Sequence, residues 1–325
     1  SARMHNISRR NFVLSATAAS AGFGLNGPLE FIGSAQAQSY ANAKLLDKGF
    51  HKFKSGDVEV TQIYDGIWNR TLEDGFVKNA PADQVKAALK GAGLADNIVP
   101  IPFTITVVKM KDQYLMFDSG TGGQVQPTAG LMASRNMKAA GIDPAKIKTI
   151  IVTHFHPDHI FGLMAKETNA QTFPDATIYV PKAELAWWTG NVPQPAQGIS
   201  NRVKATLQGW KNVQQVDGDK DVIPGVRAVS TPGHTPGHTS YLVGSGKKPL
   251  LVLGDVTNIP LLFVRNPGWQ AVFDTDGALA ETNRRKIIDR AIAENLTVTG
   301  YHYSMPGAGT FKKDGSGYAF VPVKA

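Results

Sequence analysis

Cysteine is absent from this chain of 325 residues, and several kinds of site are excluded with it. There is no disulfide, no iron–sulfur cluster, no cysteine-ligated zinc and no cysteine nucleophile. Long apolar runs are also missing, because after the N-terminal region none reaches the roughly 18 residues of a membrane span. The net charge of +8 is scattered, with short basic clusters such as those at 284–286 and 312–313, which disfavours a nucleic-acid partner. At 42% hydrophobic residues, the chain can bury a large core.

The N-terminal region differs from the rest of the chain. Ser1–Arg3 precedes a methionine and is typical of a tag remnant, and Ser8–Leu14 resembles a twin-arginine export signal. Ala35–Ala37 offers the small residues of a signal-peptidase site. The alternative is an alanine-rich arm that holds two arginines by chance. We predict that residues 1–38 are a tag remnant and signal peptide, that the export machinery carries the precursor to the periplasm, and that residues 39–325 form one domain.

Short apolar strand patterns alternate with helical patterns through the rest of the chain. Strands are expected at 58–64, 103–110, 114–117, 149–153, 177–180, 226–230, 239–243, 250–253 and 297–301. Helices are expected at 82–89, 129–140, 181–188, 201–210 and 282–294, and a surface loop at 190–200. This interleaving predicts a layered α/β protein.

A dense cluster of histidines directly follows the expected strand at 149–153. Extended backbone repeats every two residues, so His154 and His156 should point to the same side. Asp158 and His159 follow at the start of a helical turn and should return toward the same place. Imidazole and carboxylate are the ligands that zinc and similar divalent ions prefer, so this loop predicts a metal site.

Three further donors follow later elements. His234 lies in the loop 231–239, where glycine and proline let the backbone crowd a site. Asp255 directly follows an apolar strand, where a buried carboxylate needs a cation partner. His302 follows the last expected strand. We expect His238 to support a ligand from behind rather than to bind the metal itself.

The donor count predicts two metal ions, most simply zinc. Five histidines and two aspartates are too many for one tetrahedral ion and suit two ions that share a hydroxide. The donors divide into two sets with one bridging carboxylate: His154, His156 and His234; Asp158, His159 and His302; and Asp255 between them.

The pattern His-x-His-x-Asp-His, followed by His, Asp and His, resembles the metallo-β-lactamase superfamily from about Val58 to the C-terminus. The resemblance implies an αββα sandwich with the metals at the strand ends. The zinc β-lactamases of that superfamily lack an aspartate at the place of Asp255, and its flavodiiron members have glutamate at the place of His156. An aspartate matching Asp255 occurs in glyoxalase II, acyl-homoserine lactonases and methyl parathion hydrolase-like enzymes.

Finer motifs are most similar to the methyl parathion hydrolase-like branch. They are the second histidine loop at 233–241, the segment 317–323, Pro306-Gly307, Asp65-Gly66 and Asp118-Ser119-Gly120. The chain departs from this branch at positions that line the pocket in relatives: Gln124, Val125, Asn258-Ile259-Pro260, Tyr301 and Tyr303. The resemblance therefore implies the fold and the metals but leaves the substrate open.

These features together predict a hydrolase of a small apolar ester-type substrate. A hydroxide shared by two zinc ions would attack the carbonyl or phosphoryl centre of a lactone, an aryl ester or an organophosphate triester. Asp158 would accept the proton of the nucleophile, Asp255 would fix the metal spacing, and Asp118 would orient a ligand imidazole. The apolar side chains expected near the mouth of the site are Trp68, Phe155, Phe161, Trp187, Trp188, Leu261, Leu262 and Phe263.

Two other functions use the same residues. A mononuclear iron oxygenase, like the persulfide dioxygenases of this superfamily, has a similar first motif and would be distinguished by bound iron and by a requirement for oxygen. A non-catalytic periplasmic metal-binding protein would hold metal without turning over any ester. A homodimer is compatible with the sequence.

Overall fold

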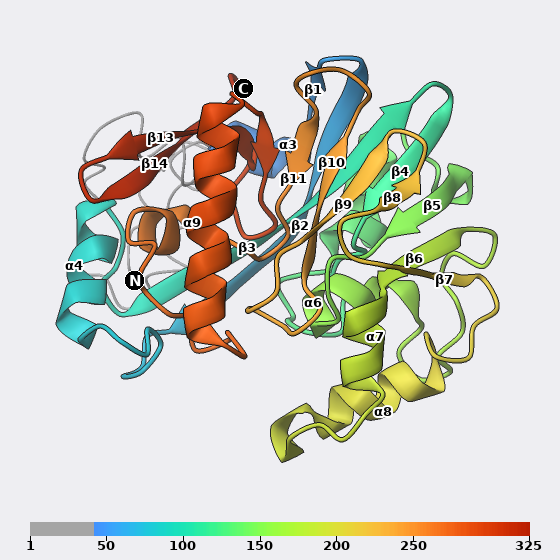
Figure 1. The fold of residues 1–325 in the computed structure, drawn as a ribbon, viewed down its shortest axis with the longest axis horizontal. Coiled ribbons are helices and arrows are strands. Elements are labelled where there is room, and N and C mark those ends of the chain that lie inside the picture. The colour runs from blue at the N-terminus through green and yellow to red at the C-terminus, as the bar shows by residue number, and fades with distance from the viewer. Residues whose placement is uncertain (1–41) are drawn as a thin grey trace, which may run out of the picture.

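The computed structural model describes residues 42–325, which form two seven-stranded sheets packed face to face (Figure 1). The first sheet contains, in spatial and chain order, β1 (Phe50–Ser55), β2 (Val58–Thr71), β3 (Ile98–Met110), β4 (Gln113–Phe117), β5 (Ile147–Ile151), β6 (Thr177–Pro181) and β7 (Val213–Val216). Strands β1 to β4 pair antiparallel, and β4 to β7 pair parallel.

The second sheet is built from the C-terminal half of the chain. Its spatial order runs opposite to its chain order: β14 (Gly317–Pro322), β13 (Ala308–Asp314), β12 (Val298–Thr299), β11 (Leu250–Val252), β10 (Thr239–Val243), β9 (Val226–Ser230) and β8 (Asp221–Ile223). The pair β11–β12 is parallel and the other pairs are antiparallel.

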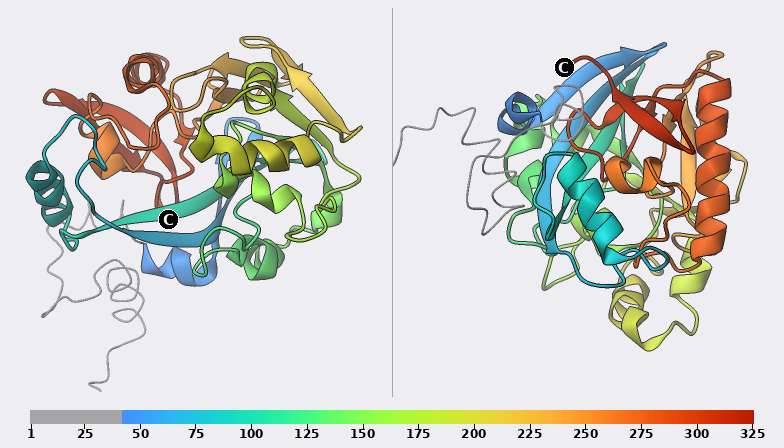
Figure 2. Two further views of the ribbon diagram at one scale, coloured as in Figure 1. Left: turned by 90° about the horizontal axis from the view of Figure 1, so that it is seen from below. Right: turned by 90° about the vertical axis from the view of Figure 1, so that its left-hand side faces the viewer.

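Helices cover the two outer faces. Figure 2 shows α3 (Ala43–Lys48) on one outer side and α9 (Gly277–Ala293) on the other, with both sheets between them. The remaining helical segments are α4 (Ala82–Gly91), η1 (Met132–Asn136), α5 (Met137–Ala139), η2 (Pro144–Lys146), α6 (Pro157–Ile160), η3 (Phe161–Leu163), α7 (Lys182–Trp188), η4 (Gln194–Ala196), α8 (Gln197–Ala205) and η5 (Pro260–Val264). The layers confirm the expected αββα sandwich.

The core divides at the sheets because alternate side chains of a strand point to opposite faces. Val108 and Phe117 of the first sheet pack against Tyr241 of β10 in the layer between the sheets. The next residue of β10, Leu242, points the other way and packs with Ile288 of α9. Strands buried on both faces read as continuous apolar runs, which is why the sequence identified them readily.

Two sequence predictions need correction. Residues 190–200 were expected to be a loop and 201–210 a helix, but η4 covers Gln194–Ala196 and α8 spans Gln197–Ala205. A proline in the first turn of η4, which a helix tolerates there, was interpreted as a loop signal. The expected helix at 129–140 contains the π-helical turn η1.

The predicted tag remnant and signal peptide, residues 1–38, lie entirely outside the described residues, so they stay predictions. None of the helices found between residues 42 and 325 has the length and apolar character needed to cross a membrane.

Candidate metal centre

The predicted ligands meet at one edge of the sandwich because of strand direction. Strand β10 is antiparallel to both β9 and β11, and β11 is parallel to β12. The carboxyl ends of β9, β11 and β12 therefore share one edge, and they are followed by His234, Asp255 and His302. The loop after β5 brings its histidines to the same place from the first sheet.

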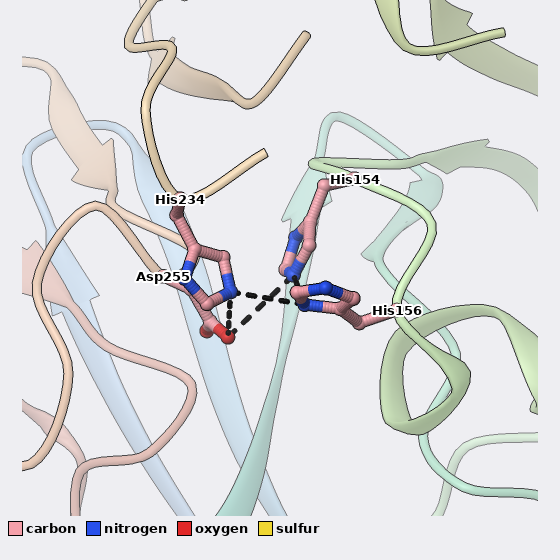
Figure 3. Close-up of side chains that lie close together, drawn as sticks. All are labelled: His154, His156, His234 and Asp255. Atoms are coloured by element: carbon pink, nitrogen blue, oxygen red, sulfur yellow. Dashed lines mark hydrogen bonds and ion pairs between the residues drawn. The ribbon is translucent and has the colours of Figure 1, made fainter. Parts of the chain in front are cut away.

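The first group of donors contains three histidines and one aspartate (Figure 3). Nε2 of His154 lies 3.1 Å from Nδ1 of His156, which in turn lies 3.0 Å from Nε2 of His234. Oδ2 of Asp255 lies 3.2 Å from Nε2 of His234 and 3.5 Å from Nε2 of His154. Three ring nitrogens and one carboxylate oxygen therefore converge on one point from two loops and a strand end.

The second group contains two aspartates and two histidines. Oδ2 of Asp158 lies 3.2 Å from Nε2 of His159 and 3.2 Å from Nε2 of His302. The same oxygen of Asp255, Oδ2, lies 3.2 Å from Nε2 of His159 and 3.0 Å from Nε2 of His302. Asp255 Oδ2 is thus common to both groups.

The donor set fits two divalent cations. Ring nitrogens about 3 Å apart, as in His154, His156 and His234, face one another with lone pairs that a shared cation would satisfy. Oδ1 of Asp255 is buried and has no hydrogen-bond partner among the described residues. A buried carboxylate without enough partners is costly, and a cation on each side of Asp255 would remove that cost.

Asp118 holds the first motif together behind the donors. Nδ1 of His159 donates to its Oδ2 at 2.8 Å, and the Thr153 hydroxyl donates to the same oxygen at 2.7 Å. The Thr153 hydroxyl also accepts from Nδ1 of His154 at 2.9 Å. Asp118 has a φ of 62°, a left-handed conformation that aspartate tolerates better than most residues. This network fixes both rings with Nε2 facing the donor groups.

Two further ligand rings are held by groups that the sequence analysis did not identify. Nδ1 of His234 donates to Oδ1 of Asp274 at 2.8 Å, and Nδ1 of His302 donates to the carbonyl of Pro102 at 2.9 Å. Asp274 lies 40 positions from His234, and no local pattern marks it. Gly233 lets the loop of His234 reach this place, because its φ is +136° and a Cβ there would lie 2.3 Å from the nitrogen of Ala280.

His238 lies outside both donor groups. Its Nε2 accepts from the backbone N–H of Asp255 at 2.9 Å, and its Nδ1 lies 2.9 Å from the Thr231 hydroxyl. His238 therefore fixes the backbone of the shared aspartate and offers no free nitrogen to a metal.

The electrostatics of the two groups differ. Burial and the neighbouring His234 lower the pKa of His156 to about 3. Burial also acts to lower the pKa of His302, but Asp255 and Asp158 outweigh it and raise that pKa to about 10. Asp255 and Asp274 likewise outweigh burial and raise the pKa of His234 to about 9. Without a metal, protons on His234 and His302 offset the buried carboxylates.

A cavity of about 240 Å³ opens onto both groups. Five of the metal donors and Pro157 line one end of this cavity. The other lining residues are Trp68, Ile101, Phe103, Val125, Asn258 and Phe273. Trp68 and Phe273 contact each other, with ring centroids 6.2 Å apart. The cavity is therefore mostly apolar, with the metal donors at one end.

Only Trp68 of the side chains expected at the mouth lines this cavity. Phe155, Leu262 and Phe263 are buried in the core, where Phe155 lies because extended backbone turns it away from His154 and His156. Phe161 packs on the core beneath the Arg202 guanidinium.

The other expected mouth residues lie nearby. Trp188 is buried with its ring 6.1 Å from that of His156, and Trp187 packs edge-on against it. Leu261 lines a separate cavity of about 300 Å³ that also reaches His302. Val125 and Asn258, where the sequence departs from relatives, do line the metal cavity, whereas Ile101, Phe103 and Phe273 were missed.

A comparison with known proteins identifies relatives of this fold. A family model described as the metallo-beta-lactamase superfamily matches residues 102–293. An N-acyl homoserine lactonase from a Bacillus species is 32% identical over 151 residues, which are 46% of this chain and 54% of that protein. The chain thus spans about half the length of this curated relative.

Two solved structures are similar over most of the chain. AidC, described as a dizinc quorum-quenching lactonase in complex with a product, has a TM-score of 0.78 at 24% identity and covers 85% of this chain and 98% of its own. AbOPH, described as a hydrolase in the beta lactamase superfamily, has a TM-score of 0.77 at 25% identity with the same two coverages.

Proposed function

The chain belongs to the metallo-β-lactamase superfamily, and on that premise we propose that it is a dizinc hydrolase that opens the ring of an N-acyl homoserine lactone. The observation that carries the proposal is the position of Asp255 Oδ2, within 3.5 Å of ring nitrogens from both donor groups. Such a shared oxygen suits two ions held side by side. The names of the Bacillus relative and of AidC support a lactone as the substrate.

The donors hold the ions in place, and Asp158 is also suited to move a proton. When bound, two zinc ions lower the pKa of a shared water to near neutrality and polarise a carbonyl. The Asp158 side chain lines the cavity and is 17% exposed, whereas that of Asp255 is 2% exposed. Oδ2 of Asp158 contacts His159 and His302, so we assign proton transfer to its Oδ1.

The proposed reaction is a ring opening by water. The water oxygen bonds to the lactone carbonyl carbon, the ring C–O bond breaks, and the released alkoxide takes up a proton to become an alcohol. Asp158 would receive the proton of the nucleophile and return it to that alkoxide. The product is an acyl homoserine, whose new carboxylic acid gives the second water proton to solvent and becomes a carboxylate.

The walls of the cavity suit the acyl part of such a substrate. Trp68, Phe103 and Phe273 offer apolar surface to an alkyl chain, and Asn258 offers an amide to a polar group beside the metals. Aryl esters and organophosphate triesters have similar apolar groups, so the walls alone do not choose among these substrates.

A substrate panel tests the proposal. The zinc-loaded protein is assayed with N-hexanoyl homoserine lactone, a nitrophenyl ester and methyl parathion, and metal content is measured on the same sample. We expect two zinc ions per chain and the highest kcat/KM on the lactone, with activity lost in chelator and restored by zinc. If methyl parathion were turned over fastest, the proposed substrate would be a phosphotriester and not a lactone. One iron per chain with oxygen uptake, or two zinc ions without turnover, would contradict the hydrolase.

We also propose that the leader at residues 1–38 directs export. The support is the arginine pair Arg9-Arg10 followed by apolar residues. Replacing both arginines with lysine should retain the protein in the cytoplasm on cell fractionation, whereas an unchanged distribution would contradict the proposal.

A further inference from the structure

Glu184 is a buried carboxylate that contacts both histidine loops of the first donor group. It belongs to α7 and is fully buried. Its Oε2 accepts from the backbone N–H of Phe155 at 2.8 Å and from Nε1 of Trp188 at 3.0 Å. Its Oε1 accepts from the backbone N–H of Gly237 at 3.0 Å. One side chain thus joins two loops that are about 80 residues apart in the chain.

The two backbone donors have particular positions among the metal donors. Phe155 lies between His154 and His156, and Gly237 lies three residues after His234. These three histidines are the ring donors of the first group. A shift of either loop along the carboxylate would therefore change the distance between the ligands from β5 and the ligand from the β9–β10 loop.

The second loop packs too closely against α7 for any side chain at Gly237. A Cβ at this position would lie 2.1 Å from the backbone nitrogen of Glu184 and 2.5 Å from its Cα. The contact between Gly237 and α7 is therefore backbone against backbone. This close packing is independent of the hydrogen bonds, and it shows that the loop of Gly237 rests directly on the backbone of α7.

Glu184 has no cationic partner to explain its burial. Within residues 42–325, no lysine, arginine or histidine lies within ion-pair distance of its carboxylate. Burial raises the pKa of Glu184, and hydrogen bonds from Phe155, Trp188, Thr235 and Gly237 act against this rise. A buried carboxylate held without a cation is costly, and here its hydrogen-bond partners include backbone N–H groups of both ligand loops.

The second donor group is supported by other residues. Asp118 fixes His159, and the Tyr301 hydroxyl donates to the carbonyl of Asp158 while its ring stacks on His159 at 3.7 Å. None of the hydrogen bonds of Glu184 goes to a residue of the second group or to its neighbours in the chain. Asp118 thus reaches both groups, His159 directly and His154 through the Thr153 hydroxyl, whereas Glu184 contacts loops of the first group only.

We propose that Glu184 is a positioning residue that sets the spacing of His154 and His156 from His234 and thereby determines the zinc affinity of the first group alone. The inference rests on the proposed function, in which each group holds one zinc ion. Glu184 contacts neither the donors nor the cavity, so it acts through the backbone of the two loops. Outer partners of this kind typically contribute a factor of about 10 to 100 in metal affinity.

Two substitutions differ in how many hydrogen bonds they remove. Glu184→Ala removes all three acceptor contacts. Glu184→Gln keeps the shape of the side chain, but whichever way the amide turns, its NH₂ group faces an N–H donor from Phe155 or Gly237. In E184A, we expect the zinc affinity of the first donor group to fall by a factor of about 10 to 100. In E184Q, the loss of affinity should be smaller.

The measurement is the number of zinc ions bound at controlled free zinc. Chelator-stripped full-length chain and its variants are dialysed against a series of Zn²⁺ buffers and then analysed for metal. The wild type should bind two ions, and both variants should bind one ion with wild-type affinity and the other more weakly. Glu184 fails as a positioning residue if both variants bind two ions as the wild type does, or if both ions weaken equally.

Two controls separate this role from general support of the fold. In H156A the first group is already damaged, so adding E184Q should leave the affinity of the remaining ion unchanged. Asp65 is a carboxylate of similar burial that accepts from Thr121 and Met132 instead, so D65N should lower the melting temperature without weakening the first ion. If E184A does not fold, E184Q alone decides the outcome. A wild type that binds fewer than two ions would contradict the proposed function rather than the role of Glu184.

Discussion

Oδ1 of Asp274 lies 2.8 Å from Nδ1 of His234, although 40 residues separate them in the chain. Asp274 is itself fixed, because its Oδ2 accepts from the backbone N–H of Ala271 at 3.2 Å and lies 3.5 Å from the Arg284 guanidinium. The pair orients the His234 ring with Nε2 toward the first donor group. A carboxylate that holds a ligand ring in this way also increases the basicity of the ligand.

Replacing Asp274 with asparagine should weaken zinc binding. D274N keeps the size of the side chain but removes the charge that accepts from His234, so we expect about a 10- to 100-fold loss of affinity for one zinc ion. Titration with zinc in the presence of a competing chelator measures the affinity of D274N and of the wild type. D276N is the matched control: Asp276 lies two residues away and caps α9, so this change should cost about 1 kcal/mol of stability at most and leave zinc affinity unchanged.

The shared aspartate should be the most sensitive position. In D255N the oxygen common to both groups loses its charge, so we expect the zinc affinity of both groups to fall. The loss should exceed the roughly hundredfold effect that is typical of residues that only support a ligand. Elemental analysis after dialysis gives the number of zinc ions that each chain retains. D255N that retained one ion at wild-type affinity would show that Asp255 belongs to a single group.

Zinc binding should release protons at pH 8. The pKa of His234 is about 9 and that of His302 about 10 in the metal-free chain, so both rings are protonated below pH 9 and must lose a proton to bind metal. Because both pKa values are raised on folding, these protons stabilise the metal-free fold below about pH 6.5 and that stability is lost as the pH rises through 9 and 10.

Calorimetric zinc titrations in buffers of different ionisation enthalpy count the released protons. His234 and His302 should together contribute about two protons at pH 8, against almost none for rings with the ordinary pKa of about 6.5. His159 should add to this release, because Asp255, Asp158 and Asp118 outweigh its burial and raise its pKa. H302A should release about one proton fewer than the wild type. Equal release by both proteins would contradict the raised pKa of His302.

Removing an aromatic wall of the cavity should affect substrate binding more than folding. Phe273 lines the cavity beside Trp68, so F273A should raise KM for an acyl lactone about tenfold, from the apolar contact it loses. F263A is the contrasting variant: Phe263 is buried in the core, so its truncation should cost about 3–5 kcal/mol of stability while KM changes little. Steady-state kinetics and thermal unfolding of both variants separate the two effects.

Local patterns predicted a layered α/β protein and the seven donors, whereas the αββα sandwich was expected from the resemblance to the superfamily. Buried strands are apolar runs, and His154 and His156 share a side of extended backbone. The same rule turns Phe155 away from them into the core, so its expected place at the mouth was wrong. The short strands β7 and β8 were missed because their residues are mostly half-buried or exposed.

The partners of the donors were harder to predict because they come from distant segments. Asp274 reaches His234 from 40 residues away, and Glu184 reaches Phe155 from 29 and Gly237 from 53. Neither carboxylate has a neighbour in the chain that marks it as functional. Asp118 was anticipated only through its resemblance to a family motif, and its contact with His159 spans 41 residues. Such contacts are set by the packing of the two sheets rather than by spacing.

Lactone hydrolysis measured against the number of zinc equivalents per chain tests the central claim most directly. The metal-free protein is titrated with Zn²⁺, and ring opening of N-hexanoyl homoserine lactone is followed at each point. A centre in which Asp255 joins two ions predicts activity that rises until two equivalents are bound and then stays constant. Full activity at one equivalent, or none at two, would contradict the account.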